Sequence, residues 1–287
     1  MSNIPFKKLM RFVFGRILFL ICFLIIACNL YAERPDSLKN QVYKLNLWID
    51  IPLTVVASAT SQWGLIVIDQ KPLLDSTTIK DLDPNDVNWF DRSATRQDAD
   101  FAPTAQKLSD YGMTISFMLP LVLLADKEIR RDWAPLALLF LETQAITSNL
   151  FSWGAAVHID RIRPLVYHPE VSYEDKTYLR NKNSFYSGHT STSASASFFT
   201  AKVYCDYHPE LGNKKYLVYA LALIPPMYTG FFRYKGMKHF PTDVLTGFAV
   251  GAGVGLLIPH LHKRTGPNLT ILPYTGRVNG LALSYRF

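Results

Sequence analysis

The sequence predicts an all-α protein, a bundle of about five to six core helices with a short extended C-terminal tail. Three observations favour this fold class. Hydrophobic residues make up 49% of the 287 residues, enough for a sizeable core. They are gathered in apolar runs that polar loops rich in Pro, Asp and basic residues separate. Most of these runs lie just at or below the roughly 20 residues that a helix needs to cross a bilayer.

The first 32 residues have the layout of an export signal. A basic segment precedes the uncharged run that starts at Ile17, and the small residue Ala32 suits cleavage. Two alternatives remain open: an uncleaved anchor helix, and a lipoprotein-type signal in which Cys28 is acylated. If cleavage follows Ala32, Cys205 is the one cysteine left, so the mature chain can form no internal disulfide and no Cys-based metal site.

We expect four segments along the chain. They are a signal peptide or anchor (1–32), an N-terminal helix with a polar loop region (33–109), the helical-bundle core (110–262) and a C-terminal tail (263–287). In the second segment, the uncharged run 51–68 is flanked by Asp50 and Asp69 and carries Thr, Ser and Gln. This composition suits either a poor membrane span or a buried helix.

The core segment contains five apolar stretches. These are a short run (112–125), a long helical pattern interrupted by Glu142 (134–159), a helix of small residues (185–201), a run that Pro225 and Pro226 must kink or break (216–232), and a Gly-rich helix (244–259). Two architectures fit: a bundle of short membrane-spanning helices, or a compact bundle held at a membrane surface. The mean hydropathy of +0.07 is low for a polytopic protein.

The tail and the charge exclude two other classes. Residues 281–287 alternate and end in an aromatic residue, as the last strand of an outer-membrane barrel does, but one strand cannot close a barrel. We therefore expect a terminal extended segment. The net charge is +7, but four of the positive charges precede residue 33, where no acid stands, which leaves +3 for the rest. Such a mild balance, without a basic stripe interleaved with aromatics, argues against a nucleic-acid partner.

The stretch from Arg233 to Asp243 combines residue types suited to phosphate chemistry. Pro241 favours the first turn of a helix, so we expect Asp243 in that turn and His239 in the loop before it. There the carboxylate can accept one imidazole N–H, which fixes the tautomer and leaves the other nitrogen free to attack. The guanidinium of Arg233 offers a planar fork for phosphate oxygens.

Two further stretches have related chemistry. Arg161 and Arg163 stand together at the end of the long helical pattern, where two guanidiniums suit an oxyanion. Ser187, Gly188 and His189 open the helix of small residues. The glycine lets backbone N–H groups approach a ligand, the helix N-terminus favours an anion, and the serine hydroxyl can donate. His189 is placed to hand a proton to a leaving oxygen.

Together the three stretches resemble the type-2 phosphatidic acid phosphatase and vanadium haloperoxidase superfamily. That family carries Lys-x6-Arg-Pro, then Pro-Ser-Gly-His, then Ser-Arg-x5-His-x3-Asp. Order and internal spacing agree over roughly residues 110–260, through Arg163-Pro164, Ser187-Gly188-His189 and Arg233-x5-His239-x3-Asp243. Three positions depart: Ala156 stands for the Lys, Tyr186 for the Pro and Phe232 for the Ser. The missing Lys charge has three candidate replacements, Arg161, His158 and Lys235, of which we expect Arg161.

The resemblance implies a hydrolase of a phosphomonoester or pyrophosphate that needs no metal ion and no cofactor. It implies that His239 attacks phosphorus and forms a phosphohistidine, that Asp243 orients it, and that His189 protonates the leaving group. It further implies that Arg163, Arg233, Ser187 and the Gly188 N–H hold the phosphate oxygens, with Arg161 as an additional candidate.

From the export signal and the apolar helices we expect a membrane-associated lipid phosphatase of the cell envelope, with its site facing the periplasm. Candidate substrates are lipid A, an isoprenyl pyrophosphate and a phosphatidyl phosphate. Two alternatives remain: a soluble-substrate acid phosphatase or vanadate haloperoxidase of the same fold, and a non-catalytic envelope protein that retains the scaffold.

Overall fold

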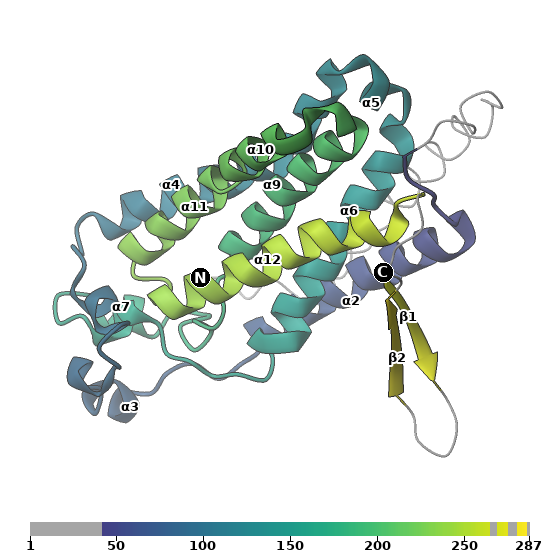
Figure 1. The fold of residues 1–287 in the computed structure, drawn as a ribbon. Helices are drawn as coiled ribbons and strands as arrows, with labels where there is room; N and C mark the ends of the chain where they lie inside the picture. Colours follow the sequence, from purple (N-terminus) through teal and green to yellow (C-terminus); the bar gives the residue numbers. More distant parts are fainter. Residues whose placement is uncertain (1–41, 265–268, 275–279, 286–287) are drawn as a thin grey trace.

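The protein is described by a computed structural model in which residues 42–264, 269–274 and 280–285 are placed. The expectations for residues 1–41, namely the signal, its cleavage and its acylation, lie outside these residues. The placed residues form the all-α bundle that the sequence predicts (Figure 1).

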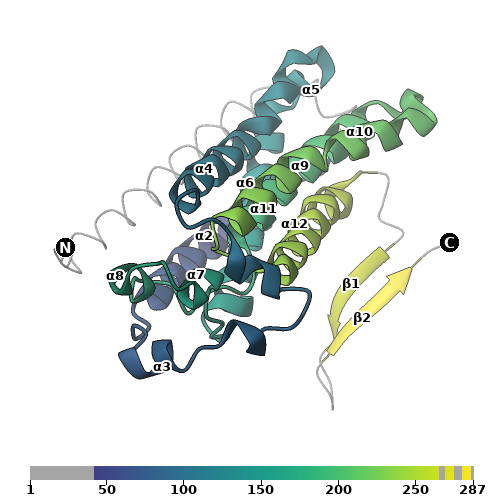
Figure 2. The ribbon, with the colours of Figure 1, turned by 90° about the vertical axis from the view of Figure 1, so that its left-hand side faces the viewer.

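Long helices run side by side along the bundle, in alternating directions (Figures 1 and 2). They are α2 (Leu47–Asp69), α4 (Ala102–Met118), α6 (Trp133–Phe151), α9 (Gly188–Tyr207), α11 (Ile224–Lys235) and α12 (Pro241–His262). Shorter helices lie at the ends: α3 (Ser76–Lys80), α5 (Lys127–Arg131), α7 (Pro164–Tyr167), α8 (Tyr173–Lys176) and α10 (Lys215–Leu221). Short 3₁₀ segments join several of them, among them Leu119–Ala125 after α4.

Local sequence explains where these helices begin. Pro241 opens α12, and the Asp243 carboxylate accepts the Phe240 N–H at 2.9 Å, which satisfies one free donor of the first turn. The predicted break at Pro225 and Pro226 is confirmed, since α10 ends at Leu221 and the two prolines stand in the first turn of α11.

The long helix predicted over 134–159 is shorter than expected. It ends at Phe151 and continues as one π-helical turn, Ser152–Ala156. Arg161 therefore does not stand at the end of this helix. It forms an isolated bridge with Asn183 instead, so a loop brings it to its place.

Helix α9 lies inside the bundle, in contact with α4, α6, α11 and α12. Its small side chains allow a close approach of α12. A Cβ atom at Gly247, Gly251 or Gly255 would lie 2.1–2.5 Å from the backbone carbonyl of Ser187, Ser191 or Ser195. Three glycines four residues apart thus bring the two backbones into contact, as small-residue stripes do in membrane helices. This contact fixes the N-terminal ends of α9 and α12 beside each other.

Among the residues that the structure describes, three apolar helical stretches are long enough to cross a membrane by length and composition: Leu47–Asp69, Ala102–Ala125 and Pro241–His262. Helix α2 is not a buried helix, because Trp48 is 92% exposed and Val56 and Trp63 are exposed as well. Its other face packs against α6. An apolar helix with an apolar outer face is typical of membrane association.

The C-terminal tail is extended, as expected, but it is paired. Strand β1 (Leu269–Tyr274) and strand β2 (Gly280–Tyr285) form an antiparallel ladder that runs from the pair Leu269–Tyr285 to the pair Tyr274–Gly280. The final alternating segment therefore finds its partner in the chain just before it.

Candidate active site

A cavity of about 220 Å³ opens at the end of the bundle where α6, α2 and α11 end and α9 and α12 begin. Its polar lining consists of Ser148, Arg163, Arg180, Asn183, His189, Ser191, Thr192, Arg233 and His239, and Gly188 adds backbone. Leu65, Ile68, Met113 and Phe151 form an apolar wall. Four of the sequence-predicted residues with charge or proton-transfer chemistry, Arg163, His189, Arg233 and His239, are thus brought together.

His239 is 2% exposed and its ring is held at both nitrogens. Its Nδ1 donates to the Ser184 carbonyl oxygen at 2.6 Å. Because a carbonyl can only accept, the proton stands on Nδ1 and the lone pair on Nε2. Nε2 lies 3.4 Å from an Arg233 nitrogen. Burial, followed by the charges of Arg233 and Arg163, holds the pKa of His239 well below its usual value. The ring is therefore neutral, with its unprotonated Nε2 inside the cavity beside Arg233.

The expected hydrogen bond from His239 to Asp243 is a wrong prediction. The Asp243 carboxylate accepts the Ser184 hydroxyl at 2.5 Å, and it also binds the Phe240 N–H and the Arg161 guanidinium. Asp243 therefore acts on His239 through Ser184. The hydroxyl of Ser184 donates to Asp243, and its backbone carbonyl accepts from His239. The sequence carried no signal that distinguished Ser184 from the other serines of its stretch.

The expected role of Arg161 at the phosphate is also at odds with the geometry. Its guanidinium binds Asp243, and it lies 2.7 Å from Asp91 and 2.9 Å from the Thr242 hydroxyl. The group also stacks on the Phe240 ring, 4.3 Å from its centroid. Two carboxylates thus neutralise Arg161, and it is not one of the described residues that line the cavity.

Arg180 also lines the cavity, although none of the three sequence motifs contains it. Asp69, at the end of α2, binds its guanidinium through both oxygens, one of them at 2.8 Å. The side chain is 42% exposed, so it stands at the mouth of the cavity. Ala156 itself is fully buried, and its carbonyl accepts from Asn183. Nothing in the sequence separated Arg180 from the other basic residues of its loop.

His189 has a carboxylate partner from another helix. Its Nε2 lies 2.9 Å from Asp110 Oδ1 on α4, and Asp110 also stands 3.8 Å from Arg233. Burial and the Arg233 charge lower the pKa of His189 to about 4, while Asp110 acts in the opposite direction. Asp110 was missed because it precedes His189 by 79 residues and belongs to no motif.

Arg233 is a buried cation, Arg163 is a partly buried one, and each has a buried N–H group that the described residues leave without a partner. In each, the Nε atom has no hydrogen-bond partner among the described residues. Burial, and then repulsion from Arg233, lowers the pKa of Arg163 to about 9, which still leaves it charged at neutral pH. Two neighbouring cations with buried, unpaired N–H groups are costly unless an anion joins them. The cavity is therefore suited to an oxyanion.

The N-terminus of α9 adds a favourable field at the same place. Gly188 lines the cavity, and a Cβ atom there would lie 3.2 Å from the Phe151 ring. Ser187 is fully buried, and its hydroxyl lies 2.8 Å from that of Thr190. The hydroxyl is thus already engaged within the helix cap, whereas the backbone of Gly188 stands at the cavity.

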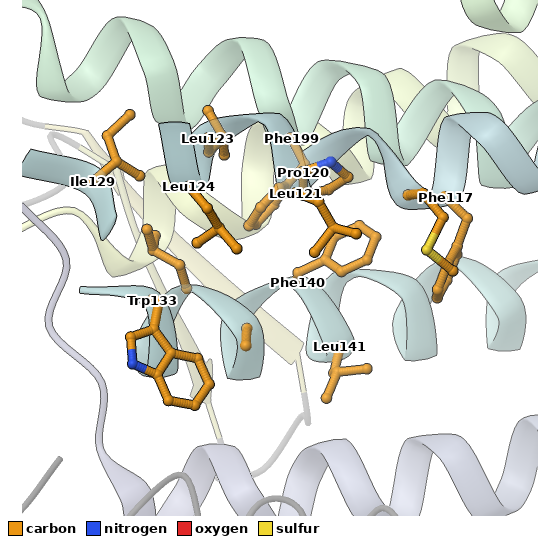
Figure 3. A pocket seen from close by; sticks show the side chains of 13 residues that line it. Phe117, Pro120, Leu121, Leu123, Leu124, Ile129, Trp133, Phe140, Leu141 and Phe199 are labelled. Atoms are coloured by element: carbon orange, nitrogen blue, oxygen red, sulfur yellow. The ribbon is translucent and has the colours of Figure 1, made fainter. Parts of the chain in front are cut away.

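A second cavity, of about 390 Å³, lies away from this site between α6 and the segment after α4 (Figure 3). Figure 3 shows that aromatic and aliphatic side chains such as Phe117, Trp133 and Phe140 form its wall. None of its lining residues carries a titratable side chain, so it offers no group for proton transfer or nucleophilic attack.

The chain is similar to known proteins in both sequence and structure. Residues 132–267 match the family model described as the PAP2 superfamily. A comparison with curated proteins gave no match. Among solved structures, the chain is similar to the crystal structure of the first transmembrane PAP2 type phosphatidylglycerolphosphate phosphatase from Bacillus subtilis, with 19% identity and a TM-score of 0.42. The similarity covers 73% of this chain and 93% of that chain.

Proposed function

On the premise that residues 132–267 match the PAP2 superfamily model, we propose that the chain is a membrane-associated lipid phosphatase that works through a phosphohistidine. The observation that carries the proposal is the meeting of Arg163 and Arg233, each with an unpaired Nε–H, and the neutral ring of His239 in one cavity. Phosphoryl transfer needs a positioned nucleophile and charge stabilisation of the phosphoryl oxygens, and this set supplies both.

In the first step, the lone pair on His239 Nε2 attacks phosphorus. The N–P bond forms while the bond to the leaving oxygen breaks, and that oxygen takes a proton from His189. Asp110 holds one nitrogen of His189, so the other can carry this proton. In the second step, the now neutral His189 accepts a proton from water. The water oxygen attacks phosphorus, the N–P bond breaks, and inorganic phosphate leaves.

The phosphoryl oxygens are held by Arg163, Arg233 and the Gly188 N–H, with Arg180 in the place of Arg161. Arg180 lines the cavity, whereas two carboxylates occupy Arg161. A charge at Arg180 thus replaces the Lys that the family pattern has at position 156. The turnover requires no added metal ion, because neutralisation of the phosphate rests on these guanidinium groups.

A lipid is favoured over a soluble ester for two reasons. The volume of about 220 Å³ is smaller than the roughly 300–1,000 Å³ typical of pockets that enclose a whole organic ligand, so it suits a phosphate group with little else. The apolar wall comes in part from Leu65 and Ile68 of α2 and Met113 of α4, two helices of membrane-spanning length. An acyl or isoprenyl chain can leave the cavity along these helices.

The test is phosphate release by the purified full-length protein. A phosphatidyl phosphate, an isoprenyl pyrophosphate and lipid A are offered in mixed micelles, beside a soluble aryl phosphate. We expect lipid turnover that persists in EDTA, no alkali-stable phosphoenzyme in His239→Gln, and at least about a 10³-fold loss of rate there. His260→Gln, on α12 away from the cavity, is the control and keeps the rate.

Two outcomes would favour the other candidate functions. Turnover of the soluble ester alone indicates a soluble-substrate enzyme. Absence of release from every substrate, with His239→Gln indistinguishable from wild type, indicates a protein that retains the scaffold without catalysis.

A further inference from the structure

A second polar cluster lies at the opposite end of the bundle from the cavity. It consists of Asp50 in the first turn of α2, Glu142 in the middle of α6, and His262, the last residue of α12. One ligand-type atom from each residue lies within 4.8 Å of the others. All three side chains are largely buried, with His262 the most exposed at 15%. The proposed phosphatase chemistry uses none of them.

Glu142 places an unsatisfied oxygen in this cluster. The residue is 2% exposed, and its Oε2 has no hydrogen-bond partner among the described residues. Oε2 lies 3.8 Å from His262 Nε2, so it is aimed into the cluster. A buried carboxylate oxygen without a partner is costly unless a proton, a donor or a cation satisfies it.

In each of the other two residues, one side-chain atom is hydrogen-bonded to the backbone and the second faces the cluster. His262 Nδ1 donates to the Ile258 carbonyl at 2.9 Å, which leaves the lone pair of a neutral ring on Nε2. Asp50 Oδ2 accepts the Asn46 N–H at 2.7 Å, while Oδ1 lies 3.6 Å from His262 Nε2. A histidine fixed by a carbonyl at its other nitrogen is the usual arrangement of a metal-binding imidazole.

The separations favour an ion between the groups over direct hydrogen bonds. At 3.6 and 3.8 Å, Nε2 is too far from either oxygen for a hydrogen bond. Metal–ligand bonds of 2.0–2.2 Å in tetrahedral geometry place ligand atoms about 3.4 Å apart. The two separations from Nε2 are within a few tenths of an ångström of this value, and all three ligand atoms lie within 4.8 Å of one another, so a modest adjustment of the side chains closes them around one ion.

We propose that Asp50, Glu142 and His262 bind a divalent transition-metal ion that joins α2, α6 and α12. Two carboxylates and one imidazole form a mixed oxygen and nitrogen set, which suits Zn²⁺ or Mn²⁺ better than Ca²⁺. The partial exposure of His262 leaves room for water as a further ligand. The role of the ion is structural, because Asp50 and His262 stand at the ends of α2 and α12 that lie away from the catalytic cavity.

The test uses Zn²⁺ as the probe on the full-length protein in detergent, stripped with EDTA and dialysed. Wild type is expected to bind one equivalent more than Glu142→Gln or His262→Gln. Its Tm should rise by on the order of 5 °C on saturation, a rise that both variants lose. Their affinity at this site should fall more than about 100-fold. Glu128→Gln makes the same chemical change on the exposed face of α5 and keeps the site.

Zn²⁺ that binds at the cavity histidines does not affect the conclusion. It contributes equally to wild type and to each variant, and the test rests on the difference in Zn²⁺ stoichiometry and Tm between them. Equal stoichiometry and equal Tm response in wild type and Glu142→Gln would overturn the proposal and leave the cluster as an ion pair. Phosphate release is measured separately at low temperature on the stripped protein. Its persistence or loss bears on the proposed function, whereas the Zn²⁺ stoichiometry bears on the metal site.

Discussion

Two arginines that stand 19 positions apart in one loop region have opposite surroundings. Arg161 is bound by Asp91 and Asp243, whose side chains are fully buried, whereas Arg180 lines the cavity and pairs with the half-exposed Asp69. A cation between buried carboxylates stabilises the fold, and a cation at the mouth of an anion site stabilises the ligand. We therefore expect Arg161 to contribute mainly to the stability of the fold and Arg180 mainly to catalysis.

For Arg180→Ala we expect a loss of kcat/KM of roughly one to two orders of magnitude with little change in Tm. The charge-assisted contact to phosphate that disappears is worth about 1.5–3 kcal/mol. For Arg161→Ala we expect a loss of stability of about 3–5 kcal/mol, because buried charges lose their partner. Thermal unfolding and initial rates of both variants check this. A lower kcat/KM at unchanged Tm in Arg161→Ala would contradict the assignment and restore Arg161 as the phosphate ligand.

The pair His189–Asp110 predicts a pH dependence. The general acid must be protonated, and a lowered pKa of about 4 means that His189 in the free protein loses its proton as pH rises above that value. We therefore expect kcat/KM to be highest at acid pH and to fall with increasing pH. Burial and the charges of Arg233 and Arg163 hold the pKa of His239 well below its usual value, which favours the neutral, nucleophilic ring.

The variant Asp110→Asn tests whether His189 causes this fall of kcat/KM with increasing pH, the falling limb of the profile. Removing the carboxylate removes an influence that raises the pKa of His189, so the falling limb should move to lower pH. Rates across roughly pH 2.5–8 on wild type and the variant give the comparison, because this range extends below the His189 pKa of about 4. An unchanged limb in Asp110→Asn would mean that another group supplies the proton.

At the scale of elements, the contact between α9 and α12 positions the site. His189 stands in the first turn of α9 and His239 just before α12, so the distance between the two helices sets the distance between the acid and the nucleophile. Gly251 lies where a Cβ atom would come within 2.1 Å of the Ser191 carbonyl, whereas Gly253 of the same helix has no neighbour within 4 Å.

Gly251→Ala is expected to destabilise the protein by about 1–3 kcal/mol and to lower kcat, because the backbones must move apart. Gly253→Ala is the matched control, and the higher helix propensity of Ala should make it neutral or stabilising by up to about 1 kcal/mol. Thermal unfolding and kcat of the pair are compared. If both variants behave alike, the close packing of α9 on α12 does not limit the geometry of the site.

At the scale of the whole molecule, the alternating helices place the two ends of the bundle on opposite sides. The Lys44 N–H donates to the His262 carbonyl at 2.8 Å at one end, and the catalytic cavity lies at the other. If every long helix crosses the membrane, Lys44 and the cavity face different compartments. An outward-facing site then requires residue 44 on the inner side of the membrane. Export with cleavage after Ala32 instead leaves residue 44 outside, so in that case an outward-facing site requires that α2 does not cross the membrane.

Cysteine labelling decides between these arrangements. With Cys205 replaced by Ser, single cysteines are placed at the exposed positions Asp175, in α8 at the same end of the bundle as the cavity, and Asn213, at the far end. For an outward-facing site we expect an impermeant maleimide to label Asp175→Cys in intact cells, beyond the labelling of the Cys205→Ser parent. Labelling of Asp175→Cys only after the inner membrane is breached would place the site inside.

The sequence by itself determined the fold class and the resemblance to the superfamily whose model matches residues 132–267. Apolar runs punctuated by polar loops are local patterns, and so are the break at Pro225 and the start of α12 at Pro241. The three short motifs are equally local, because each spans about one loop and one helical turn. Their order and spacing therefore indicated the superfamily without any knowledge of packing, while the roles of the motif residues remain predictions.

The tertiary structure alone decided which groups meet. Whether Asp243 or the Ser184 carbonyl holds His239 depends on how a loop 55 residues away packs. Asp110, Arg180 and the cluster at Glu142 reach their partners from other helices and loops, so no spacing along the chain relates them. A motif records contacts made within a few residues, whereas partners between helices follow from the packing of α9, α6 and α12, which small residues such as Gly251 permit.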